Sequence, residues 1–111
     1  MPMSKFTLAD LEQRVSDRAS ASSEQSYTRQ LLDKGVAQCA KKFGEEAVEA
    51  VLAVVSEDRE RVVAESADVL YHLLVLWAAL GIAPQDVYGA LKARQGQSGL
   101  DEKAARRKTE S

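Results

Sequence analysis

Five acidic residues recur at helical spacing in the middle of the chain. Glu45, Glu46 and Glu49 form the pattern E-E-x-x-E, and Glu65 and Asp68 form the pattern E-x-x-D after fifteen intervening residues. Residues three apart share one face of an α-helix, so each pattern predicts an acidic helix face. Carboxylate oxygens are the preferred ligands of hard divalent cations, so the natural cation is Mg²⁺, with Mn²⁺ as a substitute.

The two acidic patterns are symmetric about Glu57. Glu49 and Glu65 each lie eight residues from it, and Glu46 and Asp68 each lie eleven residues away. If the chain turns there between antiparallel helices, both pairs lie side by side, at levels about 4.5 Å apart. Four carboxylates this close cannot all stay ionised without a counter-charge. The spacing therefore predicts a metal site on a helical hairpin.

Carboxylates around a divalent cation, without an obvious protein nucleophile, indicate metal-assisted phosphate chemistry. The cation offsets the charge that builds up on the phosphate, and a carboxylate deprotonates the attacking water. Glu45 and Glu49 are the candidate bases. Lys34, Lys41 and Lys42 are candidates for holding phosphate oxygens as point charges.

Each of these residues also has a purely structural explanation. An E-E-x-x-E pattern on a helix is usually a solvated face, and the matched E-x-x-D pattern in an apolar helix is what favours a metal site. Lys41 and Lys42 are equally well explained as surface lysines. His72 lies on an apolar helix and is interpreted as a hydrogen-bonded core histidine, and Cys39 as a small buried side chain.

The fold class predicted for the chain is all-α. Apolar residues make up 45% of the 111 residues and aromatics only 5%, a composition that suits packed helices. We expect one domain over residues 1–95, built of four to five helices on a long antiparallel hairpin, and a mobile charged tail over 96–111. The predicted helices span Thr7 to Asp17, a short stretch from Ser26 that Gly35 ends or bends, Val36 to Val55, Asp58 to Leu80, and Pro84 to Arg94.

The helix predicted from Asp58 to Leu80 is apolar nearly all round from Val62 onward. Such a helix is typically buried, and a chain of 111 residues can hardly cover it alone. We therefore expect a homodimer in which helices of two copies pack together. Glu65 and Asp68 lie inside this helix, where unpaired carboxylates are costly and a metal would compensate them.

Composition also argues against several classes of protein. The formal net charge of −2 gives no electrostatic footprint for nucleic acid. The single cysteine excludes an internal disulfide and suits a reducing cytoplasm. The apolar run Val69–Ile82 is too short, and too interrupted by Tyr71 and His72, for a membrane span.

The acidic patterns resemble those of the MazG-like superfamily, the all-α nucleoside triphosphate pyrophosphohydrolases. Within it, the phosphoribosyl-ATP pyrophosphohydrolases of histidine biosynthesis are the closer match, over nearly the whole chain. The segments that carry this resemblance are SYTRQLLDKG from Ser26, KKFGEEAVEAV from Lys41, ESADVLYHLLVL from Glu65 and SGLDEKAARR from Ser98. Phe43 departs from the pattern, because a smaller aliphatic residue is expected there.

The resemblance implies a helical homodimer with the metal site on the hairpin, and the length of 111 residues predicts the stand-alone hydrolase instead of a form fused to the next pathway enzyme. It implies Mg²⁺-dependent hydrolysis of phosphoribosyl-ATP, between the α and β phosphates, to phosphoribosyl-AMP and pyrophosphate, the second step of the pathway. Glu45 would orient or activate water, Lys42 is the first choice for a phosphate contact, and Lys34 and Lys103 are further candidates. The residues implied as metal ligands are Glu46, Glu49, Glu65 and Asp68.

Two other functions remain open from the sequence. The same scaffold and acidic site would serve an enzyme that removes pyrophosphate from damaged or surplus nucleoside triphosphates. A non-enzymatic helical dimerisation module, with a structural metal or none, is the second. The segments from Ser26 and Ser98 favour the phosphoribosyl substrate over both.

Overall fold

The computed structural model describes residues 5–95 and the single residues 99, 103 and 106. Within this part of the chain the structure has no strand, which confirms the predicted all-α class. The tail predicted over 96–111 lies almost entirely outside the described residues, so the division at residue 95 stays a prediction. The helices are α1 (Leu8–Ala19), α2 (Tyr27–Asp33), α3 (Val36–Val55), α4 (Arg59–Leu80) and α5 (Pro84–Ala93).

Side-chain caps set where the first two helices begin. The Thr7 hydroxyl accepts the Asp10 backbone N–H at 3.3 Å, and the Asp10 carboxylate accepts the Thr7 N–H at 2.8 Å. Ser26 caps α2 by accepting the Arg29 N–H at 3.1 Å, and its hydroxyl donates to the Arg18 carbonyl at 2.8 Å. Capping satisfies backbone donors that a helix start leaves free. The second bond of Ser26 also ties α2 to the end of α1.

Gly35 separates α2 from α3. The sequence left open whether it bends or breaks the helix, and the structure shows a break, with α2 ending at Asp33 and α3 beginning at Val36. Gly35 has φ of +96°, a conformation that residues with a Cβ rarely adopt. The glycine therefore lets α2 fold back against α3 and α4.

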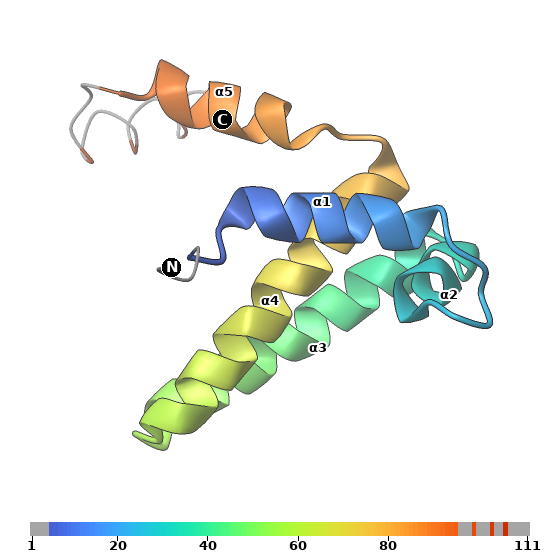
Figure 1. The fold of residues 1–111 in the computed structure, drawn as a ribbon. Helices are drawn as coiled ribbons and strands as arrows, with labels where there is room; N and C mark the ends of the chain where they lie inside the picture. Colours follow the sequence, from blue (N-terminus) through green and yellow to red (C-terminus); the bar gives the residue numbers. More distant parts are fainter. Residues whose placement is uncertain (1–4, 96–98, 100–102, 104–105, 107–111) are drawn as a thin grey trace.

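Helices α3 and α4 form the long antiparallel hairpin that the sequence predicts, packed along their length (Figure 1). The chain reverses at Ser56–Asp58, and Glu57, the centre of the acidic symmetry, has φ of +58°. Asp58 caps α4 by accepting the Arg61 N–H at 3.1 Å. The turn is thus held at the position that the acidic spacing requires.

The hydrophobic core lies at one end of the hairpin, where α1 and α2 cover it. The other end, which contains the turn, projects beyond them (Figure 1). Within the described single chain, α4 buries only His72, Leu74 and Val75, so one copy does not cover this apolar helix. The core side chains are Val15, Leu31, Cys39, Leu74 and Val75, and the exposed apolar residues of projecting α3 are Val48, Val51, Leu52, Val54 and Val55.

Among the described residues, α4 is the one helix that is long and apolar enough to cross a membrane by length and composition. A core helix of a soluble protein passes the same test. Glu65, Asp68 and His72 lie within α4, and ionisable residues are costly inside a bilayer. The apolar character of α4 therefore carries no membrane assignment.

Candidate metal and phosphate site

The register of the hairpin places residues of α3 and α4 in facing layers. Residues equally far from Glu57 lie side by side in an antiparallel pair, and successive layers are about 4.5–6 Å apart. Two layers of this register are supported by contacts, because Glu46 and Asp68 belong to one close carboxylate group and Cys39 shares a core cluster with Val75. The four layers from the turn to the core are Glu49 with Glu65, Glu46 with Asp68, Lys42 with His72, and Cys39 with Val75.

Three carboxylates converge in the middle of the hairpin. One oxygen each from Glu46, Glu65 and Asp68 can be chosen so that all three lie within 4.8 Å of one another. Glu46 and Glu65 are half-buried and Asp68 is exposed, so the cluster opens to solvent on one side. An all-oxygen donor set of this size suits a hard divalent cation of the magnesium type.

The fourth predicted carboxylate, Glu49, is not part of this close group. Its Oε2 lies 3.6 Å from Nη2 of Arg61, which reaches across from the first turn of α4. The sequence spacing placed Glu49 at the level of Glu65 but did not account for a cation on the facing helix. Glu49 is still near enough for its charge to act on Glu65.

The negative charges of the carboxylate cluster are not fully compensated by nearby cations. Burial raises the pKa of Glu65, and the like charges of Glu46, Asp68 and Glu49 raise it further, while Arg61 opposes them. A proton is thus held more tightly at Glu65 than at an ordinary glutamate. A bound divalent cation would reverse this effect.

Lys42 is the cation that the structure places against the cluster. Its Nζ lies 3.6 Å from Glu46 Oε1 and 3.7 Å from Glu45 Oε2. The pKa of Lys42 is raised, by the nearby Tyr27 phenol first and then by these two carboxylates. In contrast, Lys34 caps the end of α2, and among the described residues neither it nor Lys103 forms an ion pair with the cluster.

Sequence reasoning missed a group of aromatic and polar side chains next to the carboxylates. His72 is 6% exposed, and its ring makes edge contacts with Tyr71 at 4.9 Å and with Tyr27 at 6.4 Å. The Thr28 and Tyr71 hydroxyls share a hydrogen bond that fixes α2 on α4. The available signal was the spacing on α4, where His72 follows Asp68 by four residues and so lies on the same face.

The histidine is buried as expected, but it lacks the expected hydrogen bond. None of the hydrogen bonds among the described residues involves His72, and no described side-chain nitrogen is both fully covered and unpaired. Its ring nitrogens therefore keep some contact with solvent although the residue is 6% exposed. Burial lowers the pKa of His72, so its ring is neutral near pH 7.

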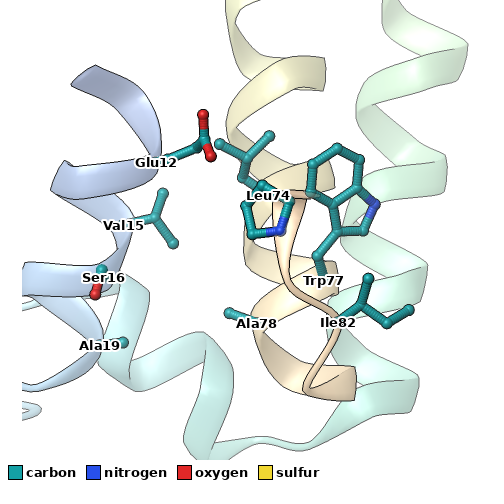
Figure 2. Close-up of a pocket in the computed structure, with 9 residues that line it drawn as sticks. Glu12, Val15, Ser16, Ala19, Leu74, Trp77, Ala78 and Ile82 are labelled. Atoms are coloured by element: carbon teal, nitrogen blue, oxygen red, sulfur yellow. The ribbon is translucent and has the colours of Figure 1, made fainter. Parts of the chain in front are cut away.

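One hollow among the described residues lies away from the carboxylates. Figure 2 shows a cavity of about 190 Å³ between α1 and the end of α4, with Leu74, Trp77 and Ile82 on one wall. Its one carboxylate, Glu12, accepts a hydrogen bond from Tyr88 at 3.0 Å. Its described lining residues are mostly apolar and include no cluster of ligating or basic groups, so the hairpin is the better candidate for phosphate chemistry.

The fold and the site define a class of protein: an all-α hairpin whose converging carboxylates suit a divalent cation, with the Lys42 ammonium group beside them. The sequence model of the phosphoribosyl-ATP pyrophosphohydrolase family matches residues 8–95. The chain therefore belongs to the phosphoribosyl-ATP pyrophosphohydrolase family, as the resemblance of its motifs predicts.

Curated relatives extend this match over almost the whole chain. "Phosphoribosyl-ATP pyrophosphatase 1" of Bradyrhizobium diazoefficiens is 55% identical over 105 residues, which is 95% of this chain and 99% of the relative. The protein of the same name from Rhodopseudomonas palustris is 52% identical over 106 residues, 96% of this chain and 99% of the relative. The "Phosphoribosyl-ATP pyrophosphatase" of Nitrobacter hamburgensis is 51% identical over 104 residues, 94% of this chain and 97% of the relative.

Proposed function

We infer that this chain is a hydrolase that converts phosphoribosyl-ATP to phosphoribosyl-AMP and pyrophosphate, the second step of histidine biosynthesis. The observation that carries this inference is the similarity of this chain to relatives named phosphoribosyl-ATP pyrophosphatase. The similarity extends over nearly the full length of this chain and of each relative. The carboxylate cluster supplies the matching chemistry, because cleavage of a phosphoanhydride gains most from charge neutralisation. We place the reaction in the cytoplasm, consistent with the lone free cysteine.

The cofactor that fits the cluster best is Mg²⁺, with Mn²⁺ as a substitute. Glu46, Glu65 and Asp68 offer only carboxylate oxygens, and burial, together with the like charges of Glu46 and Asp68, raises the pKa of Glu65. Mg²⁺ prefers such hard oxygen ligands and keeps positions for phosphate oxygens. When bound, the ion would neutralise charge on the phosphates and lower the pKa of water.

The chain's own residues would then divide the remaining tasks. Glu49, on the margin of the cluster, is the proposed fourth ligand and a candidate base, while Glu45 is the other candidate base. Lys42 would hold a phosphate oxygen, because a cation bound at Glu46 would release its ammonium group from that carboxylate. Lys34 and Lys103 are retained only as weaker candidates for phosphate contact.

The two candidate bases can be separated by removing one charge at a time. Glu45→Gln should lower kcat and leave Mg²⁺ affinity unchanged, because Glu45 lies outside the converging group. Glu49→Gln should weaken Mg²⁺ binding if Glu49 is a ligand, and should lower only kcat if it is the base. Mg²⁺ titration of each variant, paired with steady-state kinetics, distinguishes these assignments.

We also propose that the active form is a homodimer. On α3, Val48, Val51 and Val55 are 57%, 60% and 74% exposed, and on α4 Val63 is 63% exposed. Contiguous apolar surface of this kind typically marks a site of association. A second copy would cover the faces of the hairpin that α1 and α2 leave open.

The function is tested by assaying pyrophosphate release from phosphoribosyl-ATP, ATP and a panel of deoxynucleoside triphosphates, each with Mg²⁺ or with EDTA. Release from phosphoribosyl-ATP alone, abolished by EDTA, is the expected result. Release from ordinary triphosphates instead would assign the protein to the removal of damaged or surplus nucleotides. The absence of release from every substrate would contradict an enzymatic function.

A further inference from the structure

We propose that Tyr27, Lys42 and His72 form a subsite that holds the departing pyrophosphate through one ammonium group and two hydrogen-bond donors. The proposal rests on the proposed function only in requiring cleavage that releases pyrophosphate. It assigns a substrate contact to Tyr27 and His72, which the acidic motif does not include. The proposal is based on the geometry of the Lys42–His72 layer, which lies next to the carboxylates.

The first argument is the position of this layer. Lys42 and His72 face each other across the hairpin, one helical turn from the Glu46–Asp68 layer and on the side away from the turn. One turn is about 6 Å, so a chain of phosphates bound at the carboxylates would extend into this layer. The opposite neighbour is the Glu49–Glu65 layer, whose two ionised carboxylates accept hydrogen bonds and offer no donor to a phosphate.

The second argument is the free hydrogen-bonding capacity of the His72 imidazole. None of the hydrogen bonds among the described residues uses its ring nitrogens, and no described side-chain nitrogen is both fully covered and unpaired, so these nitrogens stay accessible to a small ligand although the residue is only 6% exposed. The charged groups that act on the ring are Glu46, Asp68 and Lys42, so it lies beside the metal-type cluster. A neutral imidazole can donate one N–H to a phosphate oxygen.

The third argument is the phenol of Tyr27. This side chain is 48% exposed at the start of α2, and its ring lies edge-on to His72, with 6.4 Å between ring centres. The Tyr27 phenol is also the largest contributor to the raised pKa of Lys42, in agreement with a shared position beside His72. Among the described hydrogen bonds none involves the Tyr27 hydroxyl, so it can donate to a ligand.

The residues next to Tyr27 and His72 hold these two side chains in place but offer no free hydrogen-bond donor. The Tyr71 hydroxyl is bonded to Thr28, which is fully buried. This bond fixes the start of α2, and therefore Tyr27, against α4. Tyr71 is thus a control from the same cluster: its hydroxyl has a structural partner, whereas that of Tyr27 does not.

The test is calorimetric titration of pyrophosphate into the full-length protein saturated with Mg²⁺, with AMP titrated in parallel. The variants are Tyr27→Phe, His72→Phe and His72→Gln, and the controls are Tyr71→Phe and Tyr88→Phe. We expect Tyr27→Phe and His72→Phe each to weaken pyrophosphate binding about tenfold or more, the value of a hydrogen bond to a charged group. His72→Gln should recover part of the loss, because its amide can donate.

The controls separate binding from folding. Tyr88→Phe should leave pyrophosphate affinity unchanged, whereas Tyr71→Phe should lower the melting temperature and, by loosening the start of α2, weaken pyrophosphate binding less than Tyr27→Phe does. Tyr27→Phe should keep the wild-type melting temperature, since the phenol is exposed, so it remains informative even if His72→Phe folds poorly. In kinetics, both subsite variants should raise KM more than they lower kcat, because the contact is made before cleavage.

Two results would overturn the subsite. One is pyrophosphate affinity within twofold of wild type in both Tyr27→Phe and His72→Phe. The other is a loss of AMP affinity with pyrophosphate affinity retained, which would assign the layer to the nucleoside end. If wild type cleaves other triphosphates instead of phosphoribosyl-ATP, the proposed function fails while these titrations still decide the subsite.

Discussion

Arg61 on α4 reaches back across the hairpin to Glu49 on α3, with 3.6 Å between Nη2 and Oε2. This contact draws one of the four symmetric carboxylates away from the other three. It also supplies the only cation of α4 that acts on the raised pKa of Glu65. Arg61 is therefore positioned to tune the charge of the site without binding a ligand.

We predict that Arg61→Gln strengthens metal binding. Both side chains of the pair are about half exposed, so losing it should change the free energy of unfolding by less than about 1 kcal/mol. Removing the positive charge should lower the Mg²⁺ dissociation constant by up to about fivefold. Arg59→Gln, at the exposed start of the same helix, is the matched control. Weaker metal binding in Arg61→Gln alone would show that the arginine supports the site directly.

The raised pKa of Glu65 predicts how the metal-free protein responds to pH. A carboxyl group with a raised pKa binds more protons in the folded state than in the unfolded state. The free energy of unfolding should therefore fall as pH rises from about 4.3, the ordinary glutamate value, through the raised pKa. Below that window the group contributes no penalty.

Glu65→Gln should remove this part of the pH dependence and make the metal-free protein more stable near neutral pH. Thermal unfolding in EDTA between pH 4 and pH 8 measures the effect. Glu24→Gln, in the exposed loop before α2, should follow the wild-type curve. A wild-type curve that rises steadily through the window, unaltered by Glu65→Gln, would contradict the like-charge account.

Lys42→Met should separate metal binding from substrate binding. Because Lys42 is paired with Glu45 and Glu46, removing it should leave Mg²⁺ affinity unchanged or higher. The KM for phosphoribosyl-ATP should rise about tenfold, since a charge-assisted contact to phosphate is lost. Lys41→Met, at the exposed neighbouring position, is the control. Parallel Mg²⁺ titrations and steady-state kinetics check both parts, and a drop in Mg²⁺ affinity would refute the proposed role.

Val55→Asp should disrupt the proposed homodimer. Val55 is 74% exposed near the tip of the projecting hairpin, so an isolated chain would tolerate the charge there. Burying that carboxylate against a second copy would be costly. Sedimentation velocity should show a dimer for wild type and a shift toward monomer for the variant. Leu91→Asp, 58% exposed on α5, should stay dimeric. A monomeric wild type at micromolar concentration would rule out the dimer.

Much of the fold could be predicted because its signals are local. The Thr7 capping box, the Ser26 and Asp58 caps, and Gly81 in the left-handed conformation after α4 each mark a helix end in the sequence. Glu57 could be identified as the pivot because antiparallel geometry turns equal spacing into proximity. Antiparallel geometry therefore predicts that Glu46 and Asp68 lie close together, although they are 22 positions apart in the sequence.

What could not be predicted depends on contacts between elements. The Arg61–Glu49 pair requires the relative rotation of two helices, which residue spacing alone does not define. The Thr28–Tyr71 bond joins positions 43 residues apart and depends on how α2 folds back after Gly35. The same packing brings Tyr27 to His72. His72 therefore looked like an ordinary core histidine until its surroundings were known.

The most direct test of the central claim is the rate of pyrophosphate release from phosphoribosyl-ATP as a function of Mg²⁺ concentration, in wild type and Asp68→Asn. Asp68 is the exposed member of the carboxylate cluster, so its substitution leaves the core intact. Asp33→Asn, which breaks only the surface pair with Arg29, is the control. We predict saturable Mg²⁺ dependence for wild type and the control, and at least a tenfold higher Mg²⁺ requirement for Asp68→Asn, roughly the loss of one charged ligand. Wild-type turnover in EDTA, or an unchanged Mg²⁺ requirement in Asp68→Asn, would contradict the metal site.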